Sequence, residues 1–284
     1  MTSLNACLAS ALLLLALPVA AAPEPNAVQQ ALARMYNTDY AGSARILDEH
    51  IAKNPGDPLG PTFRAASDLF SELTRLKILE GEFFADDKRI AEKEKLVPNP
   101  ALRANFERNI GKARQLAEMR LAQNGGDADS LFALCITAGL MLDYGALIEK
   151  RQLMSLTHAR EAHRHALRLL KADPTYTDAY MTTGFTEYLL GSLPFFVRWF
   201  VRFEESSGDK NLAVQRLEKV AHQGKYLGPF ARIMLSLAHF REKRYRQCES
   251  LLAGLAKEFP ENPLFKKELQ KVGEVIRKAA SSAR

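Results

Sequence analysis

Residues 165–188 read HALRLLKADPTYTDAYMTTGFTEY, and this stretch decides the fold class. Ala162, three residues before this stretch, and Ala166 and Leu169 within it lie at positions i, i+4 and i+7, so they share one face of a helix. Proline cannot continue a helix, so Pro174 marks a turn, and a second helical pattern follows it. The stretch therefore predicts two helices that are joined by a turn and pack through small and apolar residues.

The same spacing recurs along the chain. In each copy a small residue is followed by residues four and seven positions later, and then by a turn five positions further on. The copies begin at Ser43, Ala113, Ala162, Ala213 and Cys248. A helical pattern that recurs in this way is typical of a solenoid, in which stacked helix pairs bury a continuous core. Because no segment alternates apolar and polar residues with a period of two, we predict an all-α fold.

These features resemble the tetratricopeptide repeat, a helix–turn–helix unit of about 34 residues. Gly184 falls where that family has its first-helix glycine, and residues 235–260 follow the family's register a second time. The family's tryptophan position is not kept, and the turns are unevenly spaced. The resemblance implies a tetratricopeptide-like helical-hairpin solenoid, a right-handed superhelix, here with irregular and extended helices. A generic all-α bundle is the alternative.

Three parts of the chain follow from these patterns. We expect residues 1–21 to be a signal peptide, residues 22–126 to form N-terminal helical hairpins with a long polar helix, and residues 127–284 to hold the tetratricopeptide-like repeats. The last helix of the third part, residues 263–279, has one apolar face and another face that is rich in lysine. A terminal repeat needs a polar outer side, so we expect this helix to be a C-terminal capping helix.

The N-terminus has the pattern of a targeting segment. An apolar run at residues 8–19 has the length of the apolar region of a secretory signal, and Val19 and Ala21 fit the small-x-small cleavage rule. We therefore expect cleavage near Ala21 and export to a bacterial periplasm or to the extracellular space. No lysine or arginine precedes the run, so an uncleaved N-terminal anchor is the alternative.

Composition argues against some classes of protein. The chain has 39 basic and 33 acidic residues, for a net charge of +6, and its basic residues form no dense tract. This balance argues against nucleic-acid binding. Beyond the signal peptide the cysteines are Cys135 and Cys248, which occupy apolar or small-residue positions. We therefore interpret them as buried packing residues and not as a disulfide.

No catalytic or cofactor motif is present, so we expect neither an enzyme nor a bound cofactor. The nearest approach to a metal site is the group of His158, Glu161, His163 and His165. His158 and His165 share a helix face but lie about 10 Å apart along its axis, which is too far for one zinc ion. We interpret the group as a solvent-exposed polar face that holds no metal.

The family resemblance also implies a binding surface, because the first helix of each tetratricopeptide repeat lines the inner, concave face. In this register the inner positions are Phe132, Ile136, Met181, Phe185, Tyr188, Ile233, Leu237 and Phe240. Nearly all of them are apolar, which suits an apolar helix of another protein or a lipophilic small molecule. The alternative is that other helices cover this face.

Residues 193–203 are the most distinctive local feature, with Trp199 and Phe200 among five aromatic residues. The segment has three interpretations. It is an inserted helix that fills a gap between irregular repeats, or a flap that binds a partner or gates a ligand. The least favoured interpretation is a membrane-surface helix at residues 194–203. We therefore add Trp199 and Phe200 to the candidate partner- or ligand-binding residues.

The leading functional hypothesis is a non-catalytic protein-binding scaffold of the bacterial cell envelope. The alternative is a lipophilic-ligand-binding periplasmic component of a transport system. Residues 127–142, 173–190 and 208–219 somewhat resemble the repeat-containing T component of periplasmic TRAP transporters, but only Gly208-Asp209 matches its glycine-rich turn. An enzyme is the third hypothesis, and no motif supports it.

Overall fold

The computed structural model describes residues 24–79, 96–192 and 203–282. Within these ranges the chain forms eleven α-helices and no strand, so the all-α prediction is confirmed. The expected signal peptide and the candidates Trp199 and Phe200 lie outside the described residues. The helices are α1 (Ala27–Tyr36), α2 (Tyr40–Lys53), α3 (Leu59–Arg75), α6 (Pro100–Gln123), α7 (Ala128–Asp143), α8 (Gln152–Ala172), α9 (Tyr180–Ser192), α11 (Lys210–Gln223), α12 (Gly228–Arg241), α13 (Tyr245–Glu258) and α14 (Pro263–Ser282). A π-helical turn, η1 (Tyr144–Ile148), follows α7, and a 3-10 turn, η2 (Thr177–Ala179), precedes α9.

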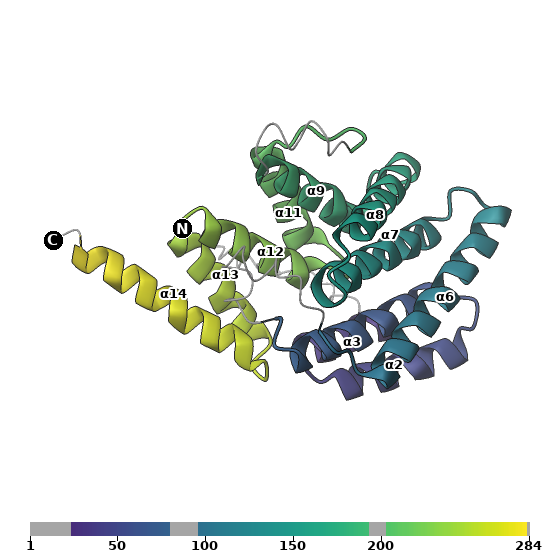
Figure 1. Ribbon diagram of the computed structural model, residues 1–284. Coiled ribbons are helices and arrows are strands. Elements are labelled where there is room, and N and C mark those ends of the chain that lie inside the picture. Colours follow the sequence, from purple (N-terminus) through teal and green to yellow (C-terminus); the bar gives the residue numbers. More distant parts are fainter. Residues whose placement is uncertain (1–23, 80–95, 193–202, 283–284) are drawn as a thin grey trace, which may run out of the picture.

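Helices that follow one another in the chain pack side by side. Contacts join α1 to α2, α2 to α3, α3 to α6, α6 to α7 and α7 to α8. Contacts likewise join α9 to α11, α11 to α12, α12 to α13 and α13 to α14. In Figure 1 the colours accordingly pass from the purple and blue helices, through the teal and green ones, to the yellow helix α14.

The recurring sequence pattern corresponds to buried helix faces. The small residues that begin each copy are all buried, namely Ser43, Ala113, Ala162, Ala213 and Cys248. The residues four positions later are buried as well, namely Leu47, Ala117, Ala166, Leu217 and Leu252. The prediction that this spacing marks the packed side of each helix is therefore confirmed.

Two copies of the pattern carry a polar residue at their third position, and both use it to join a helix to the next turn. His50 Nε2 lies 2.6 Å from an oxygen of Asp57, and Arg120 Nη2 lies 2.8 Å from an oxygen of Asp127. Each aspartate also accepts a hydrogen bond from a backbone N–H at the start of the following helix. The two aspartates therefore tie the end of one helix to the beginning of the next.

An aromatic cluster lies where the first and second halves of the chain meet. The ring of Phe132 on α7 lies 6.2 Å from Phe63 on α3, 5.0 Å from Tyr176 and 5.9 Å from Tyr226, measured between ring centres. Phe63 and Tyr226 also meet, at 5.4 Å. Aromatic pairs at such distances add to the stabilisation that burial provides. The cluster thus holds α3, α7 and the turn between α11 and α12 together.

The first described helix contacts the last ones. The ring of Tyr36 at the end of α1 lies 5.2 Å from that of Phe259, and the Asn262 side chain donates a hydrogen bond of 2.8 Å to the Tyr36 carbonyl oxygen. Gln29 donates to the carbonyl oxygen of Lys225 at 3.1 Å. Helix α1 therefore packs against the turns that precede α12 and α14.

Helix α14 extends away from the other helices at its C-terminal end (Figure 1). Its residues Phe265 and Val272 are buried, whereas Lys266 and Lys267 are exposed. This distribution has the apolar inner side and the basic outer side that the sequence pattern predicts.

One stretch of the described chain, Ala128–Ile148, is long and apolar enough to cross a membrane. However, 61% of its most apolar window is buried inside the fold, because α7 contacts α3, α6 and α8. Cys135 lies in this stretch and Cys248 on α13, and both are buried free thiols. Burial in the core accounts for the apolar character of α7.

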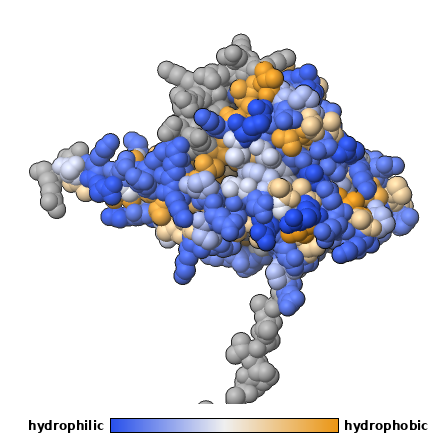
Figure 2. All heavy atoms as spheres, turned by 90° about the horizontal axis from the view of Figure 1, so that it is seen from below, coloured by the Kyte–Doolittle hydropathy of each residue, from blue (hydrophilic) through white to orange (hydrophobic). Residues whose placement is uncertain are grey.

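The surface seen in Figure 2 is mostly hydrophilic, and its hydrophobic residues form small separate groups.

Candidate functional site

Three of the predicted inner-face residues lie in the core. Phe132 belongs to the aromatic cluster, and Met181 and Tyr188 are also buried. Tyr188 packs with Ala213 and Ala238. These three predicted residues therefore offer no surface to a partner, which corrects their assignment to an open concave face. The physical reason is that residues from distant parts of the chain close over them, and a helical register does not predict such contacts.

The other described inner-face residues are half-buried. Three of them pack partly against the core, namely Ile136, Ile233 and Phe240. Phe185 on α9 and Leu237 on α12 are half-buried and are not part of this core. Leu189, one turn after Phe185, is 46% exposed and was not among the predicted residues. Its i+4 relation to Phe185, which places both residues on one helix face, is the sequence signal that could have identified it.

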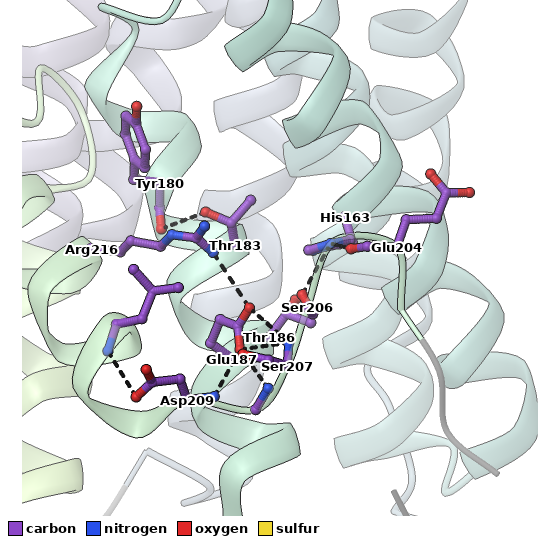
Figure 3. A network of polar contacts seen from close by, with 12 residues as sticks. His163, Tyr180, Thr183, Thr186, Glu187, Glu204, Ser206, Ser207, Asp209 and Arg216 are labelled. Carbon is purple, nitrogen blue, oxygen red and sulfur yellow. Dashed lines mark hydrogen bonds and ion pairs between the residues drawn. The ribbon is translucent and has the colours of Figure 1, made fainter. Parts of the chain in front are cut away.

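Glu187 on α9 holds the loop that leads into α11 (Figure 3). The backbone N–H groups of Ser207, Gly208 and Asp209 donate to its carboxylate at 3.2, 2.6 and 3.0 Å. Gly208 has φ 77°, a conformation that glycine adopts without strain. Arg216 on α11 lies 3.7 Å from the same carboxylate, which is fully buried. The negative charge is therefore matched by donors from the loop and from α11.

His163 on α8 holds the same loop from the opposite side (Figure 3). Its Nε2–H donates to the carbonyl oxygen of Glu204 at 2.7 Å, and Phe203 lies edge-on to the ring at 5.5 Å. Burial lowers the pKa of His163, and burial also lowers the pKa of His165 to about 4. The interpretation of these two histidines as a solvent-exposed polar face is therefore wrong. Both are buried because α8 turns this face towards the fold.

Asp178 plays the corresponding part for the turn that precedes α12. The backbone N–H groups of Lys225, Tyr226 and Leu227 donate to its carboxylate at 2.9, 3.1 and 2.7 Å. Burial raises the pKa of Asp178, and the three N–H donors partly offset this by stabilising the charged form. Together with Glu187, Asp178 ties α9 and its N-terminal turn to the segments that precede α11 and α12.

Helix α7 contacts α9 at the level of Cys135. Cys135 Sγ lies 3.1 Å from Thr182 Oγ1, so the two helices touch at this level. One turn further on, a Cβ atom added to Gly139 would meet no described atom within 4 Å. Another turn further on, Asp143 is half-buried and has neither a hydrogen bond nor an ion pair with any described residue. Burial raises the pKa of Asp143 to about 7.

A groove of about 380 Å³ lies between α6 and α8. Its apolar walls are formed by Phe106, Ile110 and Met141. Arg114 and Glu161 form its polar side and are paired at 2.5 Å. Gly111 also lines the groove, and a Cβ atom there would meet no described atom within 4 Å. The groove combines an apolar wall with one polar side, and it is open to solvent.

The described residues include no group of three or more histidine, cysteine, aspartate or glutamate side chains that could hold a metal ion. His158 Nδ1 and His165 Nε2 approach Glu161 at 3.6 and 3.9 Å, which is ion-pair range. Arg114 pairs with the same carboxylate, so Glu161 serves Arg114 and the two histidines as a structural partner.

The described fold and its sites define an all-helical protein that is built from consecutive packed helices. No protein-family model matches the chain, and no curated protein matches it closely enough to be a relative. The resemblance to the tetratricopeptide repeat therefore rests on the recurring sequence pattern.

Proposed function

We propose that the protein is a non-catalytic scaffold with a tetratricopeptide-like solenoid architecture that binds another protein through an apolar surface. Two observations support the architecture. The helices pack in chain order, and the small residues of the recurring pattern are buried between them. In a solenoid each helix pair contacts mainly its neighbours. The contacts of α1 with the turns before α12 and α14 are an irregular addition that joins the two ends.

The observation that carries the proposed function is a set of apolar residues on α9 and α12 that lie outside the core cluster and are partly exposed, here called the apolar strip, namely Phe185, Leu189 and Leu237. None of the three belongs to the core cluster, and Leu189 is nearly half exposed. Tyr188 on α9 and Ala238 on α12 share one buried cluster, so the two helices are close at this level. Grouped apolar side chains that water reaches gain free energy when a partner covers them. An apolar face of a partner helix provides such a cover.

A binding experiment with two matched variants tests this proposal. Phe185→Ser changes the apolar strip, and Leu153→Ser changes a leucine on α8 that is 87% exposed and lies away from it. Wild type and both variants serve as bait in an extract of the source cells, and captured proteins are quantified by mass spectrometry. We expect one protein to be captured by wild type and by Leu153→Ser but not by Phe185→Ser.

Loss of folding is excluded by comparing thermal midpoints, and Leu189→Ser provides a second, more exposed change in the same strip. Capture of the same protein by wild type, Phe185→Ser and Leu189→Ser alike would contradict the proposed binding function.

The proposed location in the cell envelope is tested separately, because it rests on the N-terminal pattern. Edman sequencing of the protein from a periplasmic or extracellular fraction should begin at Ala22, and an intact Met1 would contradict cleavage.

A second candidate function is the binding of a lipophilic small molecule, which the groove between α6 and α8 favours. Its walls are apolar, and one polar side would orient an amphiphile. Gly111→Leu should fill the groove, whereas Gly254→Leu places the same side chain at an equally open position on α13. Native mass spectrometry should detect an added small-molecule mass on wild type and Gly254→Leu and none on Gly111→Leu. A bare protein mass in all three would contradict this candidate.

A further inference from the structure

A row of basic side chains runs along the outer face of α8. All four are exposed, and they lie four, four and three residues apart, namely Arg160, Arg164, Arg168 and Lys171. Side chains at this spacing share one face of a helix. Ala162 and Ala166, which are buried, lie on the opposite face. The basic row is therefore the side of α8 that is turned away from the core.

The positive charge of the basic row is not compensated by neighbouring acids. The ion pairs that α8 makes with described residues all involve Glu161, on the side that faces α6. None of the four residues of the row forms an ion pair within the described chain. By contrast, the exposed arginines Arg34 and Arg246 are paired with Asp39 and Glu249. The row is thus a local concentration of the net charge of +6.

The same face of α8 carries an exposed apolar residue at its N-terminal end. Leu153 is 87% exposed, and its neighbour Met154 is 54% exposed. Leu153 precedes Lys171 by five full helical turns, so the two side chains point in the same direction about 27 Å apart. Helix α8 therefore presents one straight face that is apolar at one end and basic along the rest.

We propose that this face of α8 binds an anionic membrane surface. The guanidinium groups of the basic row would pair with lipid phosphates, which arginine binds through two parallel hydrogen bonds. Leu153 and Met154 would enter the boundary between the headgroups and the acyl chains, as apolar residues of surface-bound helices do. The proposal goes beyond the proposed function, because it concerns α8 and a lipid surface instead of the apolar strip and a protein.

Other occupants account for less of this face. An acidic helix of a protein would match the basic row, but it would also have to place an apolar residue against Leu153. A membrane supplies phosphates and apolar chains along the whole length of α8, whatever the register. Single-stranded nucleic acid is bound by aromatic side chains as well as by charge, and this face carries no aromatic residue.

Two kinds of lipid vesicle test the proposal on the full chain. One kind contains phosphatidylcholine alone, and the other contains equal parts of phosphatidylcholine and phosphatidylglycerol. Any insertion of the apolar run at residues 8–19 is common to both vesicles and to all variants, so the readout is the ratio of the two partition coefficients in co-sedimentation. We expect wild type to prefer the anionic vesicles strongly at low salt and to lose most of this preference at high salt.

Two double variants with equal net charge test the role of the basic row. Arg160→Gln with Arg164→Gln removes two charges from the row. Arg108→Gln with Lys112→Gln removes two exposed charges from α6, where neither residue lines the groove towards α8. Each basic residue near an anionic surface contributes roughly fivefold to binding, so the first variant should lose roughly 25-fold of the preference. The second should stay close to wild type.

A pair of single variants tests the apolar end. Leu153→Ser should weaken binding to the anionic vesicles by roughly tenfold, because it removes a side chain that leaves water on binding. Met119→Ser changes a methionine on α6 that is 55% exposed, and it should have little effect. All four changes lie at exposed positions, and equal thermal midpoints establish that the folds are intact.

Three results would overturn the proposal. Wild type would show no preference for the anionic vesicles, or the two double variants would lose it equally, which would make net charge the cause. The third result uses a glutamate-rich helical peptide as a second ligand. If the variant of the basic row loses this peptide while both vesicles bind it as they bind wild type, the row recognises an acidic protein and not a membrane.

Discussion

The carboxylate of Glu187 accepts a hydrogen bond of 2.6 Å from the backbone N–H of Gly208, across 21 residues of sequence. Asp178 makes a similar bond of 2.7 Å with the N–H of Leu227, across 49 residues. In both cases a buried acid at α9 or its N-terminal turn holds the backbone that leads into a later helix. The apolar strip on α9 and α12 depends on these two anchors, because they set the positions of α11 and α12 relative to α9.

Removing the Glu187 carboxylate should therefore destabilise the protein. Glu187→Ala leaves the N–H groups of Ser207, Gly208 and Asp209 without their acceptor in a buried place. We expect the free energy of unfolding to fall by about 3 kcal/mol in urea denaturation. Glu204→Ala is the matched control, because its side chain is exposed and only its backbone carbonyl is used. Equal urea midpoints for the two variants would contradict an anchoring role for Glu187.

His165 should make the protein less stable in acid. Its pKa is lowered to about 4 in the folded state, mainly by burial, from an unfolded value of about 6.5. The unfolded state therefore binds a proton more readily, so the free energy of unfolding decreases as the pH falls from about 6.5 to about 4. The full effect is about 3 kcal/mol. His165→Gln should lose less stability than wild type between pH 7.5 and pH 4.5, and a parallel loss in both proteins would contradict this.

Asp143 should show the opposite sign. Its pKa is raised to about 7 in the folded state, so the folded protein holds this proton more tightly than the unfolded chain does. Stability from this group is present at low pH and is lost as the pH rises through about 7. Asp143→Asn should therefore raise the free energy of unfolding at pH 8 by about 2 kcal/mol, after allowance for solvent screening of a half-buried group. Thermal melts at pH 4 should show little difference, and a destabilised variant at pH 8 would contradict the unpaired state of Asp143.

The helical glycines should differ according to their surroundings. A Cβ atom at Gly184 would lie 3.0 Å from Arg216 Cβ and 3.3 Å from Leu217 Cγ, so α9 and α11 approach closely there. Gly184→Leu should destabilise the protein by about 1–3 kcal/mol through overpacking. Gly254→Ala has open space and should stabilise α13 by about 0.5–1 kcal/mol. Differential scanning calorimetry measures both, and an unchanged midpoint for Gly184→Leu would contradict the close packing.

The positions of the helices and of their buried faces could be predicted from the sequence to a large extent. The spacing of Ala213 and Leu217 marks a buried stripe because residues four apart always share a helix face. The last helix, expected at residues 263–279, is found at Pro263–Ser282. Burial of His163 and His165 was missed, because a polar side chain at a helical position carries no local sign of what packs on it.

The sequence by itself determined that this chain forms helices and which stripe is buried in the five that carry the recurring pattern. These are local properties, because hydrogen bonding and side-chain direction within a helix follow from residues at most seven positions apart. Only the tertiary structure decided that Phe132 is covered while Leu189 is exposed, and that Glu187 has partners while Asp143 has none among the described residues. The exposure of a side chain and its hydrogen-bond partners depend on contacts between residues tens of positions apart, and the periodicity of the sequence does not predict such contacts.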